Sequence, residues 1–96
     1  MPTYISLCRW TQQGAQKVKE SPARLDAGRK AFQGEGVKIK EFFMTTGKYD
    51  SIIVVEAPSD EALARATLKL IALGNISTHT MRAFTEDEYR KIMSAL

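Results

Sequence analysis

The stretch VKIKEFFMTTGKYDSIIVVEAP, residues 37–58, decides the fold because it reads as two strands that reverse on each other. Apolar and charged residues alternate through residues 37–46, and a run of four β-branched residues occupies 52–55, as is typical of strands. Gly47-Lys48 predicts a two-residue type II′ turn, since that turn takes glycine at its first central position. The stretch therefore predicts an antiparallel hairpin.

A strand and a helix precede the hairpin. TYISLCRW, residues 3–10, alternates with a period of two and predicts a strand. Residues 11–32 predict a helix in two pieces, because Ser21 suits an N-cap and Pro22 suits the first helical position. The sequence Gly-Glu-Gly at 34–36 should end the helix, since glycine accepts the left-handed conformation beyond the last turn.

A second helix, a fourth strand and a short third helix follow the hairpin. Residues 58–75 predict a helix with Ser59 as its N-cap, and residues 75–84 alternate as a strand. Thr85 and Glu88 have the spacing of a capping box and open the last helix. The buried stripe expected on the helix at 58–75 is Leu63, Ala66, Leu70 and Leu73. One side of the last helix is apolar: Tyr89, Ile92, Met93 and Leu96.

The order of these elements predicts a single α+β domain that spans residues 1–96. Two strand–helix–strand crossovers that flank a hairpin make the split βαβ, or ferredoxin-like, plan βαββαβ, with a C-terminal helix added. In that plan a four-stranded antiparallel sheet carries both long helices on one face. A chain of 96 residues is long enough to bury a core without disulfides.

Cross-strand pairing in the hairpin places apolar side chains on both faces of the sheet. One face is expected to hold Val37, Ile39, Phe43, Ile52 and Val54. The opposite face is expected to hold Phe42, Met44, Ile53 and Val55. Two helices can cover only one face, and a large exposed apolar patch usually marks an interface or a ligand cavity. We therefore expect a homodimer, or a higher oligomer, through the second face, with the C-terminal helix as part of the cover.

Composition and charge exclude several classes of function. The net charge is +3, but acids are interspersed among the bases and no aromatic stacking motif accompanies them, so a solvated helix face is expected rather than a nucleic-acid surface. No window approaches the roughly 18 apolar residues of a membrane span, and the N-terminus lacks an export signal. The single cysteine, Cys8, suits a reducing compartment. We expect a cytoplasmic protein that binds neither nucleic acid nor membrane.

A set of short motifs in this order resembles the GYD domain family. The motifs are W-T-x-x-G at 10–14, K-E-S-P-x-R at 19–24, G-x-Y-D at 47–50, V-E-A-P at 55–58 and R-A-F-T-E-D-E at 82–88. The resemblance covers essentially the whole chain and implies the dimeric α/β-barrel arrangement, in which two ferredoxin-like protomers pack sheet to sheet. It implies no reaction. The hairpin pattern T-G-K-Y-D is also similar to one in the ligand-sensing domain of leucine-responsive-type regulators, although their helix-turn-helix is absent from this sequence.

Metal and nucleophile chemistry find little support in the sequence. His79 is the only histidine, so a multi-histidine metal site cannot form within one protomer. Cys8 has no histidine, lysine or helix N-terminus near it in sequence, which favours a packed, inert thiol over a nucleophile. The chain has no glycine-rich phosphate loop and no HExxH pattern. We therefore expect no metal and no cofactor.

Tyr49 and Asp50 are the sharper candidates for a site. Adjacent strand residues point to opposite faces, so they are not expected to act as an acid–base pair. Asp50 could lie under the helices and pin the hairpin by accepting backbone hydrogen bonds or by pairing with Arg9 or Arg82, or it could be a buried base with a raised pKa. Trp10 and His79 could line the same pocket, although Trp10 also suits core or interface packing.

Three classes of function stay open on this sequence. The first is a small homodimeric protein that binds a small apolar or aromatic molecule in a pocket beside the sheet, with Trp10, Tyr49, Asp50 and His79 as candidate ligand-binding residues. The second is a cofactor-independent monooxygenase or isomerase, by analogy with other dimeric α/β-barrel proteins. The third is a purely structural or protein-interaction dimer.

Overall fold

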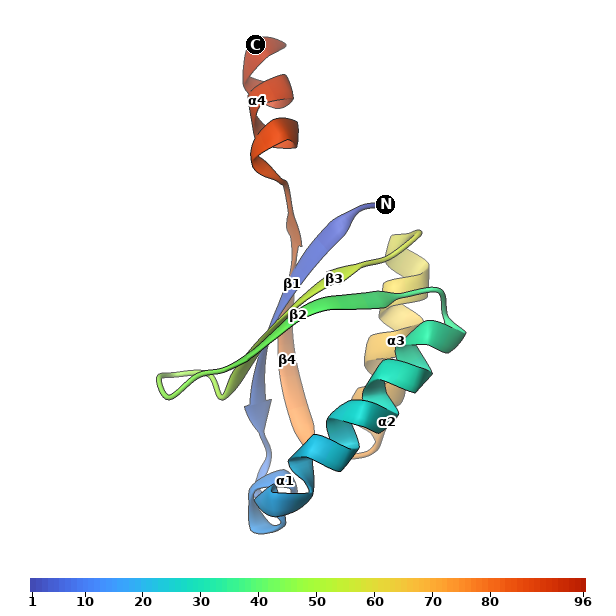
Figure 1. The fold of residues 1–96 in the computed structure, drawn as a ribbon, viewed down its shortest axis with the longest axis vertical. Helices are drawn as coiled ribbons and strands as arrows, with labels where there is room; N and C mark the ends of the chain where they lie inside the picture. The colour runs from blue at the N-terminus through green and yellow to red at the C-terminus, as the bar shows by residue number, and fades with distance from the viewer.

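The computed structural model describes residues 1–96 and shows a four-stranded antiparallel sheet with helices on one face (Figure 1). The elements are β1 (Thr3–Trp10), α1 (Gln12–Gln16), the 3-10 helix η1 (Val18–Glu20), α2 (Ser21–Gly34), β2 (Lys38–Met44), β3 (Ser51–Glu56), α3 (Asp60–Ala72), β4 (Ile76–Ala83) and α4 (Glu86–Ser94). The strand order is β2-β3-β1-β4. The predicted ferredoxin-like α+β plan, including the divided first helix, is confirmed.

β1 runs through the middle of the sheet and pairs with β3 on one side and β4 on the other. Its side chains alternate between the two faces: Tyr4, Ser6 and Cys8 are buried on the helix side. These side chains meet those of α2 and α3 in one core, because amphipathic helices bury their apolar stripe against the sheet. The core consists of Tyr4, Cys8, Phe32, Val37, Ile53, Val55, Ala57, Ala62, Leu63 and Ala66.

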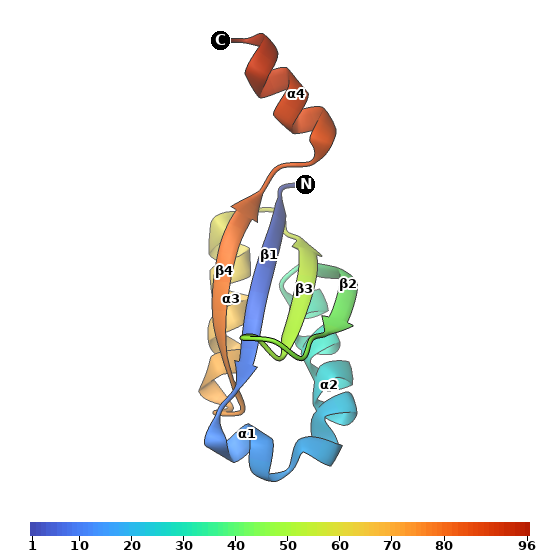
Figure 2. The same ribbon diagram turned by 90° about the vertical axis from the view of Figure 1, so that its left-hand side faces the viewer.

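The side of the sheet that faces away from α2 and α3 is the open sheet face (Figure 2). Ile5 and Leu7 lie at its centre, because they alternate with the buried residues of β1. Their cross-strand partners in β3 and β4 share that face. The central residues of the open sheet face are Ile5, Leu7, Phe43, Ile52, Val54, His79 and Met81.

A β-bulge in β2 changes which of its side chains face the helices. Ile39 pairs with Val55, whereas Glu41 pairs with Val54, so one extra residue lies between them. Since Val55 is buried in the core, the bulge brings Ile39 to the helix side and Glu41 to the open sheet face. The predicted placement of Val37 and Ile39 on the same face as Val54 is therefore wrong, and Val37 is itself a core residue.

Residues 45–50 join β2 to β3 through a loop that is wider than the predicted two-residue turn. Gly47 lacks the positive φ that a type II′ turn requires at that position. Instead, the N–H of Thr45 donates to the carbonyl of Asp50 at 2.9 Å, and the N–H of Asp50 donates to the carbonyl of Cys8 at 2.8 Å. The prediction of a type II′ turn is wrong because the loop is anchored to β1 as well as to its own strands.

The long helices α2 and α3 begin and end as predicted, except at the N-cap of α2. Gly36 and Gly74 have φ values of 73° and 82° and follow the last turns of α2 and α3. Ser59 caps α3 by accepting a backbone hydrogen bond at 3.1 Å. Ser21 is the first helical residue of α2 and Glu20 holds the N-cap position, because η1 leads directly into α2. The expectation that Ser21 is the N-cap is therefore wrong.

α3 buries a shorter stripe than the sequence predicts. Leu63 and Ala66 are buried against the sheet, and Leu70 packs against the core while remaining partly exposed. Leu73 is 62% exposed because it is the C-cap residue, at the point where the chain leaves the helix. The predicted stripe thus extends one turn too far.

α1 is held against the start of β4 by a close backbone contact. A Cβ atom at Gly14 would lie 2.0 Å from the carbonyl oxygen of Asn75, so only glycine fits at this position. The N–H of Thr11 donates to the same carbonyl at 3.1 Å, and the Thr11 hydroxyl donates to the carbonyl of Gly74 at 2.6 Å. These contacts fix the end of β1 beside the beginning of β4.

α4 projects from the far end of β4 and lies away from the sheet of its own protomer (Figures 1 and 2). Its predicted capping box is confirmed: the N–H of Glu88 donates to the Thr85 hydroxyl at 3.2 Å, and the N–H of Thr85 donates to the Glu88 carboxylate at 2.9 Å. The large apolar side chains of this C-terminal segment are exposed: Tyr89, Ile92, Met93 and Leu96. Within the protomer, α4 therefore provides no cover for the open sheet face.

Candidate functional site

The four residues predicted to line a ligand site lie near the 45–50 loop and form two separate pairs. Asp50 Oδ2 accepts a hydrogen bond from the N–H of Trp10 at 2.9 Å. The rings of Tyr49 and His79 meet edge to face, with centroids 6.1 Å apart. Tyr49 and Asp50 are in the loop and not in β3, and their side chains have different partners, so they do not form an acid–base pair.

The contact of Asp50 is the one expected of an acid that anchors the hairpin. A buried or half-buried N–H without a partner is costly, and the carboxylate supplies that partner to Trp10. Neither arginine considered as an ion-pair partner is bound to it. Arg9 Nε donates to the carbonyl of Lys48 at 2.7 Å, and Arg82 lies beside Glu88, with Nη2 and Oε2 3.7 Å apart.

Tyr49 lies among cationic groups at the margin of the open sheet face. The Arg9 guanidinium carbon is 5.3 Å from the ring centroid, and Lys48 Nζ is 5.9 Å from it. The quadrupole of an aromatic ring attracts cations placed in this way. With the His79 ring at its edge, the cluster presents two cations, a phenol and an imidazole at one end of an apolar face.

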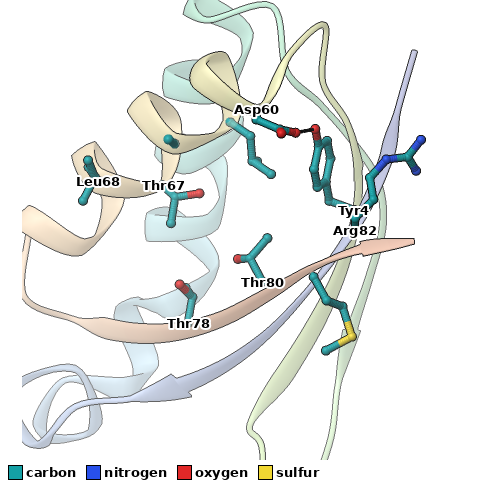
Figure 3. A pocket seen from close by; sticks show the side chains of 10 residues that line it. Tyr4, Asp60, Thr67, Leu68, Thr78, Thr80 and Arg82 are labelled. Atoms are coloured by element: carbon teal, nitrogen blue, oxygen red, sulfur yellow. Dashed lines mark hydrogen bonds between the residues drawn. The ribbon is translucent and has the colours of Figure 1, made fainter. Parts of the chain in front are cut away.

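A groove of about 520 Å³ lies between α3 and β4, and none of these four residues lines it (Figure 3). Thr78 and Thr80 point into it from β4, and Thr67 and Leu68 face it from α3. We call this the α3–β4 groove. Its lining consists of Tyr4, Asp60, Leu63, Ala64, Thr67, Leu68, Thr78, Thr80, Met81 and Arg82.

The charged groups at one end of the α3–β4 groove are already engaged. The Tyr4 hydroxyl donates a hydrogen bond to Asp60, and this bond, assisted by burial, raises the pKa of the Tyr4 phenol. The Arg82 side chain points away from the groove, and its guanidinium carbon lies 4.4 Å from the centroid of the Phe84 ring (Figure 3). The Thr80 hydroxyl is also hydrogen-bonded, to that of Ser6 at 2.7 Å, so the groove offers a ligand mainly the hydroxyls of Thr67 and Thr78 and apolar walls.

Sequence reasoning missed this groove, although one signal for it exists. The positions of β4 on the helix side are Ile76, Thr78, Thr80 and Arg82, of which only Ile76 is apolar and packs against the core, whereas β1 and β3 place mostly apolar residues there. Polar residues on the helix side indicate a strand that the helices cover only in part. The contact between Tyr4 and Asp60 joins residues 56 positions apart, so no local sequence pattern predicts it.

Burial raises the pKa of the Cys8 thiol, which keeps it protonated and makes it a poor nucleophile.

No group of three or more His, Cys, Asp and Glu side chains is placed to hold a metal ion. The helices are also too short or too polar for any of them to cross a bilayer.

Known proteins resemble this chain in both sequence and fold. A protein of Thermus thermophilus named glutamine synthetase and cystathionine beta-lyase binding protein is 33% identical over 84 residues, which cover 86% of this chain and 88% of that protein. A crystal structure of a protein from Thermus thermophilus aligns over 88% of this chain and 95% of its own, with a TM-score of 0.57 and 23% identity.

A feast or famine regulatory protein from M. tuberculosis, solved in complex with L-methionine, also has this fold. It aligns over 88% of this chain with a TM-score of 0.67 and 13% identity, and the chain spans about half of that regulator, 51%. At such identities the likeness concerns the fold alone. The family model described as GYD domain matches residues 4–93, which is nearly the whole sequence, and the chain therefore belongs to the GYD domain family.

Proposed function

We propose that this protein is a small homodimeric binding protein that attaches to a metabolic enzyme. The observation that carries the proposal is the open sheet face, whose apolar residues have no cover in the protomer. Phe43 and Met81 on that face are 54% and 46% exposed. An antiparallel sheet with one solvated face normally shows polar residues there, and a contiguous apolar patch usually marks an interface.

A second copy of the chain is the occupant proposed for the open sheet face. Two such faces are alike and apolar, and a twofold axis brings the same patch of each protomer together. The pairing would bury Ile5, Leu7 and Val54 at its centre, which are the partly exposed residues of the middle strands. The helices α2 and α3 would then lie on the outside of the dimer.

The partner class is supported by the relative from Thermus thermophilus, which carries the names of two enzymes that it binds. At 33% identity across most of both chains, the two proteins are close enough for a shared kind of partner to be proposed. The exposed apolar surfaces favour a protein-binding role, and the engaged states of Asp50 and Cys8 do not favour a catalytic one. The buried, unpaired Cys8 also supports the proposal of a cytoplasmic setting.

Light scattering coupled to size-exclusion chromatography tests the homodimer. The wild-type protein should have the mass of two chains, and Val54→Asp should have the mass of one, because it places a charge in the centre of the proposed interface. Val18→Asp is the matched control, since Val18 is 39% exposed in η1 and lies off the sheet. A wild-type monomer at micromolar concentration, or a Val54→Asp dimer, would overturn the proposed assembly.

Titration calorimetry with purified glutamine synthetase and purified cystathionine β-lyase tests the partner class. Binding of either enzyme by the wild-type dimer supports the proposal. The absence of heat and of co-elution with both enzymes would overturn it, whatever the oligomeric state. The enzymes should come from the organism that supplies the chain, so that their surfaces match.

A small apolar or aromatic ligand is the second candidate, and the cluster around Tyr49 favours it. The Tyr49 and His79 rings, with Arg9 5.3 Å from the Tyr49 centroid, stand where a second protomer would close over the end of the open sheet face. Trp10 and Asp50 lie next to this cluster through the loop. A thermal-shift screen with aromatic acids tests it: a shift for the wild type that disappears in both Tyr49→Ala and His79→Ala is expected.

A further inference from the structure

We propose that a polar pocket at one end of the sheet binds a free α-amino acid with a polar side chain. The pocket has a volume of about 300 Å³ and lies beside α1, at the end of the sheet opposite α4 (Figures 1 and 2). We call it the α1–α2 pocket. No apolar residue lines it, and its lining consists of Gln13, Gln16, Lys17, Glu20, Arg24 and Asn75. The pocket requires neither the homodimer nor the enzyme partner of the proposed function.

Hydrogen bonds fix the walls of the α1–α2 pocket relative to one another. Arg24 Nη2 donates to the carbonyls of Gly14 at 3.0 Å and Lys17 at 3.2 Å, which joins α2 to α1. Gln13 Nε2 donates to Asn75 Oδ1 at 3.1 Å, and the close backbone contact between Gly14 and Asn75 joins the same two segments. A pocket whose walls are fixed in advance binds a ligand without the cost of ordering them.

Three charged groups of the pocket are free to meet a ligand. Lys17 Nζ and the Glu20 carboxylate take part in no hydrogen bond or ion pair within the protomer. Arg24 donates only through Nη2, which leaves Nη1 and Nε free. Glu20 and Arg24 are four residues apart, a spacing at which helical side chains often pair, but Arg24 turns to the carbonyls of α1 instead. The pocket thus offers two cations and an anion at the same time.

This set of charges matches a zwitterion. An α-amino acid has a carboxylate, which Arg24 and Lys17 would bind through charge-assisted hydrogen bonds, and an ammonium group, which Glu20 would bind. The amides of Gln16 and Asn75 suit a polar side chain, above all another amide, because an amide both donates and accepts hydrogen bonds. An apolar side chain would find no apolar wall to pack against.

The size of the pocket sets the size of the ligand. A volume of about 300 Å³ is at the lower end of the range for small-molecule sites. The pocket therefore suits a single amino acid rather than a peptide.

Chemical-shift titration of the full-length ¹⁵N-labelled protein with L-glutamine tests the assignment. Glutamine should shift the amide signals of residues 11–24 and of Asn75 in a saturable way, because these residues surround the pocket. Two analogues each lack one charged group: glutaramate has no amino group, and 4-aminobutanamide has no carboxylate. Each should bind at least about tenfold more weakly than glutamine, because it loses a charge-assisted contact. L-Leucine, of similar size and with an apolar side chain, should also bind at least about tenfold more weakly.

Two substitutions test the charges of the protein. Lys17→Gln and Glu20→Gln should each weaken glutamine binding at least about threefold, since an exposed charge contact is worth less than a buried one. Both side chains are exposed, so the fold should be kept. Lys19→Gln is the matched control, because Lys19 is an exposed residue of the same 3-10 helix that does not line the pocket. It should bind glutamine as the wild type does.

Several results would overturn the assignment. One is the absence of saturable shifts with glutamine, and another is a set of shifts confined to the 45–50 loop. Glutaramate that binds as well as glutamine, or Glu20→Gln that binds as well as the wild type, would show that no ammonium group is recognised. None of these results depends on the mass of the protein or on its binding of an enzyme, so the proposed function is tested separately.

Discussion

The carboxylate of Asp50 accepts a hydrogen bond from the backbone N–H of Trp10 at 2.9 Å, and this contact ties the 45–50 loop to the end of β1. The neighbouring Tyr49 turns instead to His79 on the open sheet face. Two adjacent residues thus serve different parts of the molecule. Asp50 fixes the loop to the central strand, and Tyr49 takes part in the surface that a second protomer or a ligand would meet.

Replacement of Asp50 by alanine should destabilise the fold by about 1–3 kcal/mol, because it leaves the N–H of Trp10 without its acceptor. Asp50→Asn keeps an oxygen acceptor of the same shape and should cost less. Urea unfolding followed by tryptophan fluorescence measures both, since Trp10 is the only tryptophan. Equal stability of Asp50→Ala and the wild type would show that the loop needs no anchor at this point.

Gly14→Ala should destabilise the protein strongly, by about 1–3 kcal/mol or more, because its Cβ atom would lie 2.0 Å from the carbonyl oxygen of Asn75. Gly34→Ala is the matched control. Gly34 is a helical residue with no neighbouring atom within 4 Å of the added Cβ, so alanine there should stabilise by about 0.4–1 kcal/mol. Thermal unfolding of the two variants compares them, and a stable Gly14→Ala protein would contradict the close approach of α1 to β4.

Glu35 should contribute stability that depends on pH. Its hydrogen bonds from Lys69 and Arg65, at 2.6 and 2.9 Å, lower the pKa of its carboxyl group below the usual range. A lowered folded-state pKa means that the contribution is present above the usual carboxyl pKa and is lost as the pH falls through the folded value. The melting temperature of Glu35→Gln should lie below that of the wild type at pH 7, and the gap should close on acidification. A gap that is constant with pH would contradict this assignment.

Ile92→Ala should leave the free energy of unfolding within about 0.5 kcal/mol of the wild-type value, because Ile92 is 43% exposed on α4. Leu63→Ala is the comparison in the core. Leu63 is 5% exposed, and its truncation should cost about 2–5 kcal/mol. Guanidinium titration of both proteins measures the difference. A large effect of Ile92→Ala would mean that α4 packs against the body of the protein.

Much of the fold could be predicted from periodicity and caps alone. The alternation of β1, the glycine after α2 and the Thr85–Glu88 capping box each act within a few residues, so sequence inspection finds them. The bulge in β2 could not be found in this way, because the pattern around Ile39 is satisfied by either register until the core packing of Val55 decides it. The turn was misread for a similar reason, since contacts of β1 hold the loop.

The candidate site was harder to predict than the fold because its contacts join distant parts of the chain. Strand geometry predicted the separation of Tyr49 from Asp50, but both residues lie in the loop, and their partners, His79 and Trp10, are set by the order of strands in the sheet. The α3–β4 groove depends on how far α3 lies from the edge strand. No spacing in the sequence encodes that distance.

The isolation of α4 has a consequence for the changes that this end of the protomer tolerates. The body of the protein is constrained at nearly every core position, whereas α4 needs only its capping box and a helical sequence to keep its shape. Mutations can therefore accumulate on its apolar side without loss of folding. A tag or label attached behind this helix should leave the rest of the protomer undisturbed.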